Sequence, residues 1–209
     1  MSELKIGKII LGMCQTNCYY LYREGESKVI FVDPAENGKY IYDMLQKKGL
    51  EIEAIILTHG HFDHIMGAEE LRKLSEVKVY APMEDKVLLN NPDINYSSQW
   101  AYSYSMEADE YYRDGDELVF GDISCKVLYT PGHTIGSSCL YFENDKILLS
   151  GDTLFAESVG RTDLPTGSMS KLVRSVRDVL FVLPDDVKVY PGHGPDTSIG
   201  HEKEWNTCV

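Results

Sequence analysis

Short runs of apolar and β-branched residues recur along the chain, and turn-forming residues separate them. In the first half these runs predict strands over residues 8–11, 18–23, 28–32, 53–57 and 77–80. Helical spacing of apolar residues predicts a helix over 39–48, which Gly49 ends, and a second helix over 67–74. The first half therefore has the order strands, then helix, then further strands.

The second half repeats this order. Strands are predicted over residues 117–120, 124–129, 138–142, 146–149 and 187–190. An amphipathic helix is predicted over 170–180, and a short final helix, capped by Thr197, is predicted to include Glu202 and Trp205. Two such halves predict an α/β fold in which sheets pack together with helices outside, a four-layer αββα sandwich. We expect one domain over residues 1–209.

Residues 91–113 differ from the rest of the chain because they are rich in Tyr and polar residues and contain Trp100. This composition predicts a helical insertion or a lid. We expect its aromatic side chains to pack against the domain more readily than to form a binding surface.

Composition and charge narrow the classes of function. The chain has 209 residues, 43% of them hydrophobic, which is enough for one sizeable domain. Its net charge of −13 repels phosphate backbones and anionic membranes, so we expect neither a nucleic-acid partner nor a membrane partner. The first eight residues lack an apolar secretory segment and the five cysteines are an odd number, which together favour a cytoplasmic protein with reduced thiols.

The segment Thr58-His59-Gly60-His61-Phe62-Asp63-His64 carries the strongest chemical signal. It places four groups that can bind a metal within six residues, namely His59, His61, Asp63 and His64. Imidazole and carboxylate are preferred ligands of Zn²⁺ and similar ions. Gly60 allows an unusual backbone angle, so the two flanking histidines could point at one position.

Three further candidates follow predicted strands and lie next to Gly or Pro: His133, Asp152 and His193. Any one of them alone is better explained as a hydrogen-bonding or turn residue. Together with the histidine-rich segment they predict a metal centre, because strand ends can present side chains from distant parts of a chain to one pocket. His201 lies in the predicted final helix and is expected at the surface.

The pattern His59-x-His61-x-Asp63-His64, followed in order by His133, Asp152 and His193, resembles the metallo-β-lactamase superfamily over essentially the whole chain. Within that superfamily the chain is similar to the glyoxalase II-like branch, the hydroxyacylglutathione hydrolases. The stretches that carry this likeness are Thr16-Asn17-Cys18-Tyr19, Thr130-Pro131-Gly132-His133-Thr134, Ser150-Gly151-Asp152-Thr153-Leu154-Phe155 and Tyr190-Pro191-Gly192-His193-Gly194. The sequence ends soon after His193, without the helical domain of the longer glyoxalase II enzymes, so it resembles the short single-domain branch.

The resemblance implies a division of roles among the seven ligands. His59, His61 and His133 would hold one metal; Asp63, His64 and His193 would hold a second; Asp152 would bridge them. The expected cofactor is a pair of divalent ions, zinc or else iron or manganese. A hydroxide that bridges the two ions would attack a carbonyl carbon, and Asp63 would act as the catalytic residue that orients it or accepts its proton.

The implied substrate is a small-molecule thioester of the hydroxyacylglutathione type, since a thiolate leaves without strong acid catalysis. Arg161, in the segment Gly160-Arg161-Thr162-Asp163, could bind a substrate carboxylate through two hydrogen bonds, or could form a turn or dimer contact. One alternative is a persulfide dioxygenase with a single iron held by His59, His133 and Asp152, and another is a lactonase. β-Lactam hydrolysis and RNA cleavage are not expected, and a homodimer is left open.

Overall fold

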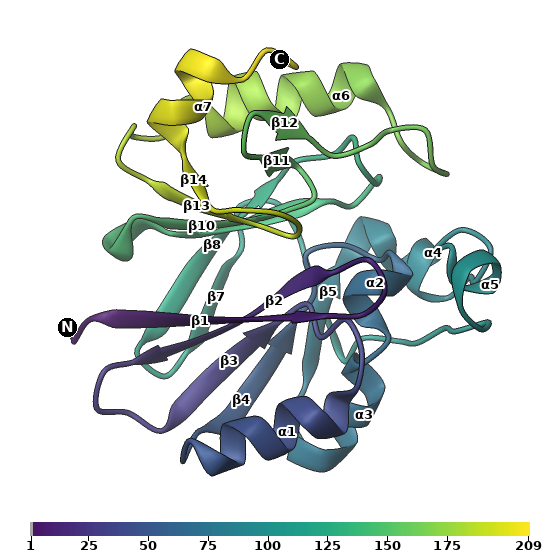
Figure 1. Cartoon of the computed structure of the whole chain (residues 1–209), viewed down its shortest axis with the longest axis vertical. Coiled ribbons are helices and arrows are strands. Elements are labelled where there is room, and N and C mark those ends of the chain that lie inside the picture. Colours follow the sequence, from purple (N-terminus) through teal and green to yellow (C-terminus); the bar gives the residue numbers. More distant parts are fainter. Residues whose placement is uncertain (1) are drawn as a thin grey trace. The chain divides into compact units, whose positions relative to one another are not determined.

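The computed structural model describes residues 2–209, which divide into two compact units (Figure 1). Unit 1 consists of Met1–Tyr112 and Val119–Ser124, and unit 2 consists of Arg113–Leu118 and Cys125–Val209. Each unit has its own cluster of buried apolar side chains. The two units are therefore described one at a time.

Unit 1 is built on a six-stranded sheet in the order β1-β2-β3-β4-β5-β6. Its strands are β1 (Leu4–Leu11), β2 (Thr16–Arg23), β3 (Lys28–Val32), β4 (Glu51–Ile56), β5 (Val79–Pro82) and β6 (Glu110–Tyr112). The first three strands pair antiparallel, whereas each neighbouring pair from β3 to β6 is parallel. The carboxyl ends of β3, β4 and β5 consequently meet at one edge of the sheet, where ligand sites in α/β folds are usually found.

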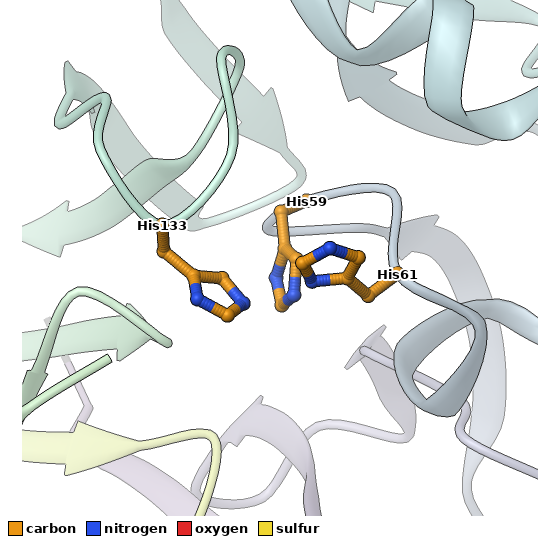
Figure 2. Close-up of side chains that lie close together, drawn as sticks. All are labelled: His59, His61 and His133. Carbon is orange, nitrogen blue, oxygen red and sulfur yellow. The ribbon is translucent and has the colours of Figure 1, made fainter. Parts of the chain in front are cut away.

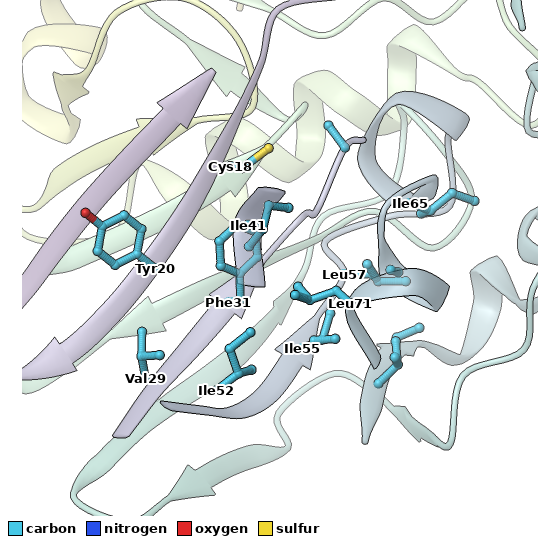
Figure 3. Close-up of a cluster of buried hydrophobic side chains, with 14 of the residues drawn as sticks. Cys18, Tyr20, Val29, Phe31, Ile41, Ile52, Ile55, Leu57, Ile65 and Leu71 are labelled. Carbon is cyan, nitrogen blue, oxygen red and sulfur yellow. The ribbon is translucent and has the colours of Figure 1, made fainter. Parts of the chain in front are cut away.

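The helices of unit 1 are α1 (Gly38–Lys47), α2 (Phe62–Ile65), α3 (Ala68–Ser75), α4 (Lys86–Leu89) and α5 (Ser97–Trp100), with a 3₁₀ turn η1 at Met83–Asp85. Asn37 caps the N-terminus of α1, and its side chain accepts a hydrogen bond from the backbone N–H of Tyr40. Helices α1 and α3 lie side by side on one face of the sheet (Figure 1). They bury Ile41 and Leu71 in a core that contains Phe31 (Figure 3).

Unit 2 contains most of a second six-stranded sheet in the order β14-β13-β10-β9-β8-β7. Its strands are β7 (Glu117–Phe120), β8 (Ile123–Tyr129), β9 (Ser138–Phe142), β10 (Ile147–Gly151), β13 (Lys188–Pro191) and β14 (Thr197–Ser198). The strands β11 (Leu154–Phe155) and β12 (Ser158–Val159) form a separate hairpin. Strand β9 is antiparallel to both β8 and β10, and β10 is parallel to β13, so β8, β10 and β13 run in one direction.

The helical elements of unit 2 are the 3₁₀ turn η2 (Glu143–Asp145), the α-helix α6 (Met169–Arg174), which continues as the π-helical turn η3 (Ser175–Leu180), and α7 (Ile199–Trp205). Val176 and Leu180 from the π-helical turn and Ile199 from α7 pack against sheet residues that include Leu148 and Val189. Helix α6, with its π-helical continuation, and helix α7 lie on the same side of this sheet (Figure 1).

Most strands and helices expected from the sequence are present, although several of their ends differ from the expected residues. Strand β1 begins at Leu4 rather than at residue 8. The predicted cap at Thr197 is wrong: Ser198 caps α7, because Thr197 is paired with Val189 in the sheet and its hydroxyl donates to the buried Glu202. The predicted helix over 170–180 is α-helical only in its first part.

Residues 91–113 contain helix α5 and strand β6, so part of this segment is helical as expected. Tyr112 is buried, and its hydroxyl donates a hydrogen bond to the carbonyl oxygen of Leu57. Trp100 and Tyr102 are 57% and 62% exposed and do not belong to the core. None of the helices formed by residues 2–209 has the length and apolar character needed to span a membrane.

The contact between α1 and α3 provides a test of the fold. A Cβ added at Gly38 would lie 2.5 Å from both the carbonyl oxygen of Gly67 and the backbone nitrogen of Leu71. We expect Gly38→Ala to lower the free energy of unfolding by about 1–3 kcal/mol, because backbone atoms of two helices would have to move apart. Urea unfolding followed by circular dichroism measures this change. Gln46→Ala, on the exposed face of α1, is the control and should stay within about 0.5 kcal/mol of the original protein; equal stability of both variants would contradict the tight contact.

Candidate metal centre

In unit 1 the histidine-rich segment connects β4 to α2 and is almost fully buried. Strand β4 ends at Ile56, and His59 and His61 lie in the connection that follows it. Because β3 and β5 flank β4 in parallel, residues that follow those strands reach the same sheet edge. Asp33 follows β3 directly, and Asp85 follows β5 after a short turn.

Asp33 organises this edge through a buried network. Its Oδ1 accepts a hydrogen bond of 2.7 Å from the backbone N–H of Thr58, and its Oδ2 accepts one of 2.7 Å from the Thr58 hydroxyl. The same Oδ2 lies 2.8 Å from Nδ1 of His64. Thr58 Oγ1 is also 3.1 Å from Nδ1 of His59. One carboxylate thus holds His64 directly and His59 through Thr58.

This network also assigns the tautomers. Thr58 has one hydroxyl proton, and it is donated to Asp33, so Oγ1 accepts from the Nδ1–H of His59. Asp33 accepts from the Nδ1–H of His64 in the same way. Nε2 is then the atom that carries the lone pair in both rings. Metal-binding histidines typically have this arrangement, in which the other ring nitrogen donates to a carboxylate or another acceptor.

His61 and Asp63 complete the set in unit 1. The ring centroids of His59 and His61 are 5.0 Å apart and the ring planes are nearly perpendicular. Figure 2 shows the two side chains next to each other. Asp63 Oδ2 accepts a hydrogen bond of 3.3 Å from the buried hydroxyl of Thr16, and it lies 3.7 Å from Nε2 of His64. All four ligands predicted from this segment therefore lie together.

In unit 2, Asp152 lies between two histidines. Its Oδ2 is 3.4 Å from Nε2 of His133 and 3.5 Å from Nε2 of His193. The three residues follow β8, β10 and β13, the strands that run in one direction, so they share a sheet edge. Figure 2 includes His133, on the connection after β8. The three ligands predicted outside the histidine-rich segment are thus neighbours as well.

The backbone of Gly160-Arg161 supports the ligands of unit 2. The carbonyl oxygen of Arg161 accepts a hydrogen bond of 2.8 Å from Nδ1 of His133. A Cβ at Gly160 would lie 1.9 Å from the carbonyl oxygen of Asp152 and 3.1 Å from Nδ1 of His133. This position therefore requires glycine, since any side chain would displace one of the two ligands.

The Arg161 side chain makes a different contact. Its guanidinium donates to both carboxylate oxygens of Asp163, at 2.7 and 2.8 Å, and these hydrogen bonds lower the pKa of Asp163 to about 2. This is the turn contact that the sequence offered as an alternative. Binding of a substrate carboxylate by Arg161 stays a prediction.

Sequence reasoning missed four residues at these edges: Asp33, Thr58, Asp85 and Gly160. Asp33 could have been found, because it follows a predicted strand just as Asp152 does. Thr58 and Gly160 were within the motifs, but their contacts come from other strands or from the backbone. Asp85 lies beyond a predicted strand without a neighbouring His or Gly, so no local pattern marked it.

The donor set fits divalent metal ions. Buried imidazoles and carboxylates that offer Nε2 and oxygen atoms are the ligands of zinc, iron and manganese centres. Cys18 is buried near this cluster, and burial raises the pKa of its thiol to about 12.

The comparison with protein families agrees with this geometry. The model of the metallo-β-lactamase superfamily matches residues 11–193. The chain belongs to this superfamily. Its α/β architecture, with two mixed sheets and flanking helices, is confirmed as the fold of the superfamily by similar solved structures. A B3 metallo-β-lactamase, BLEG-1, has a TM-score of 0.92 at 33% identity and covers 97% of this chain and 98% of its own.

Three further relatives carry names other than β-lactamase. TTHA1623, solved in a di-iron-bound form, has a TM-score of 0.86 at 30% identity over 97% of this chain and 100% of its own. A probable metallo-hydrolase of Streptococcus pyogenes is 35% identical over 97% of this chain and 89% of its own length. The hydroxyacylglutathione hydrolase GloC of Haemophilus influenzae is 29% identical over 92% of both chains. Two of these three relatives are named as hydrolases, and the third was solved with iron bound.

The support from Gly160-Arg161 leads to a test. We expect Gly160→Ala to weaken metal binding by about 10–100-fold, because its Cβ displaces Asp152 or His133. Arg161→Ala should bind metal like the original protein, because the carbonyl oxygen that holds His133 remains. Competition with a chromogenic chelator measures both affinities, and circular dichroism checks the fold. Unchanged affinity in Gly160→Ala would refute the requirement for glycine.

Proposed function

We propose that this chain is a dinuclear metal-dependent hydrolase whose ligands are His59, His61, Asp63, His64, His133, Asp152 and His193. The position of Asp152 carries the proposal: one carboxylate oxygen lies within 3.5 Å of Nε2 atoms of two histidines. The resemblance to the metallo-β-lactamase superfamily implies that these histidines hold different metals, and a bridging carboxylate would have this position. The similarity to TTHA1623 in its di-iron form supports a two-metal site and keeps iron beside zinc and manganese as the native metal.

The proposed substrate is a small-molecule thioester of the hydroxyacylglutathione type. The similarity to GloC along nearly the whole chain supports this choice. The chemistry supports it too, since a thiolate is a good leaving group and no residue beyond the ligands is an evident general acid. Water and the thioester would give a carboxylic acid and a free thiol.

Two bound ions would lower the pKa of a water molecule and polarise the substrate carbonyl. The protein groups then have separate tasks. Asp63 would orient the attacking water and accept its proton. The hydroxyl of Thr16 donates to Oδ2 of Asp63 and would hold this carboxylate in place. Asp33 and the carbonyl of Arg161 would keep the rings of His64 and His133 in place during this step.

β-Lactam hydrolysis is a second candidate. The sequence does not favour it, but the 33% identity with BLEG-1 at a TM-score of 0.92 does. Attack on the amide carbonyl of a strained ring needs the same water and the same polarised oxygen as attack on a thioester. The two candidates differ in the leaving group, so a substrate panel separates them.

Metal content and substrate choice can be measured together. The untagged protein would be analysed for metals and then assayed on S-lactoylglutathione, a chromogenic β-lactam and a lactone. About two equivalents of zinc, iron or manganese with thioester cleavage would support the proposal. About one equivalent of iron without thioester cleavage, and with oxygen uptake on glutathione persulfide, would replace it with a persulfide dioxygenase. Cleavage of the lactam or the lactone alone would assign that substrate class instead.

Ligand variants test the two-metal centre. We expect His61→Ala and Asp152→Ala to lower kcat/KM by more than about 10³-fold, since each removes a ligand of the ions that polarise the substrate. The far-ultraviolet circular dichroism spectrum should stay close to that of the original protein. His201→Ala is the control, because the His201 side chain is exposed and contacts Glu157 and Trp205 rather than any proposed ligand. Full activity of metal-loaded Asp152→Ala would rule out the bridging role.

A further inference from the structure

Residues 83–97, called here the supporting segment, hold the backbone of the histidine-rich connection at two points. Oδ2 of Asp85 accepts a hydrogen bond of 2.8 Å from the N–H of Gly60. The carbonyl oxygen of Asn95 accepts one of 3.0 Å from the N–H of Phe62. Gly60 lies between His59 and His61, and Phe62 lies between His61 and Asp63. The two hydrogen bonds therefore fix the backbone at Gly60 and Phe62, the residues that separate the proposed ligands His59, His61 and Asp63.

The supporting segment is itself well ordered by buried contacts. The side-chain amide of Asn95, fully buried, donates to the carbonyl oxygens of Leu88 and Tyr104 at 3.1 and 2.9 Å. Leu88 is also fully buried, and a Cβ built at Gly60 would lie only 2.7 Å from its Cβ. The connection and the supporting segment are thus in direct contact, without room for a side chain at Gly60.

Packing alone does not explain why a carboxylate, Asp85, is buried at this position. It is fully buried, although carboxylates are rarely buried unless they are paired or bound to strong donors. A hydrogen bond from a backbone N–H to an ionised carboxylate is about twice as strong as one between neutral groups. A leucine or alanine could fill the space, but neither could hold the Gly60 peptide in one orientation.

We propose that Asp85 is a positioning residue for the metal centre, and that the supporting segment sets the directions of His59 and His61 before metal binds. The proposal deepens the proposed function, since it rests on these two histidines being metal ligands. It assigns to residues 83–97 a role in metal affinity rather than in covering the substrate. Asp85 itself binds neither metal nor substrate.

Three variants test this role: Asp85→Ala, Asp85→Asn and Glu84→Gln. Asp85→Asn keeps an acceptor for Gly60 but loses the charge. Glu84→Gln is the matched control, because it removes one negative charge from the exposed neighbouring side chain. Each purified protein is stripped of metal and titrated with Zn²⁺ against a chromogenic chelator. The absorption spectrum with Co²⁺ and the melting temperature with and without metal are recorded for the same samples.

We expect Asp85→Ala to bind Zn²⁺ about 10–100-fold more weakly and to show an altered Co²⁺ spectrum. Asp85→Asn should bind about fivefold more weakly, because a neutral acceptor replaces a charged one. Glu84→Gln should match the original protein. The increase in melting temperature on adding Zn²⁺ should shrink in the same order, since it reports binding to the folded state.

A purely structural Asp85 would give a different result: a lower melting temperature of the metal-free protein, with Zn²⁺ affinity and Co²⁺ spectrum unchanged. That result would overturn the proposal. If Asp85→Ala does not fold, unchanged affinity in Asp85→Asn overturns it equally. An original protein that binds no metal would overturn both this proposal and the proposed function, whereas metal-dependent hydrolysis with unaffected Asp85 variants would overturn the positioning role alone.

Discussion

The buried carboxylate of Asp33 is the group on which the organisation of unit 1 depends. Removing a carboxylate from water has a large free-energy cost unless hydrogen-bond donors surround it. Here the donors are the backbone and hydroxyl of Thr58 and the ring of His64. The contacts that offset this cost also fix the tautomers of His59 and His64. Stability of the sheet edge and readiness for metal binding therefore have the same physical origin.

In both units the proposed ligands are brought together by the same strand arrangement. Parallel or co-directional strands end at one edge, and the residues that follow them meet there although they are distant in sequence. The supporting acceptor differs: a carboxylate holds His64, whereas the backbone carbonyl of Arg161 holds His133. Glycine is required in both units, at Gly60 because a Cβ would meet the Leu88 side chain and at Gly160 because it would meet the backbone of Asp152.

The proposed ligands could be predicted from the sequence because they combine a specific local motif with positions directly after strands. Long apolar strands such as β2 and β4 could be predicted for a related reason, since their burial leaves a clear pattern. The supporting groups could not. The carbonyl of Arg161 carries no side-chain signal, and Asp85 acts on Gly60 across 25 residues of sequence. The short elements β6 and α4 were missed because three or four residues carry no measurable periodicity.

The metal centre and the choice of substrate depend on different parts of the molecule. BLEG-1 and GloC, at 33% and 29% identity over nearly the whole chain, carry the names of a β-lactamase and of a thioester hydrolase. The proposed water and polarised carbonyl serve both reactions equally well, so the ligands and the groups that hold them do not discriminate between the substrates. Discrimination requires different contacts to the leaving group and the acyl group. We therefore expect specificity in this chain to come from side chains outside the ligand connections and outside the contacts of Asp33, Asp85 and Gly160.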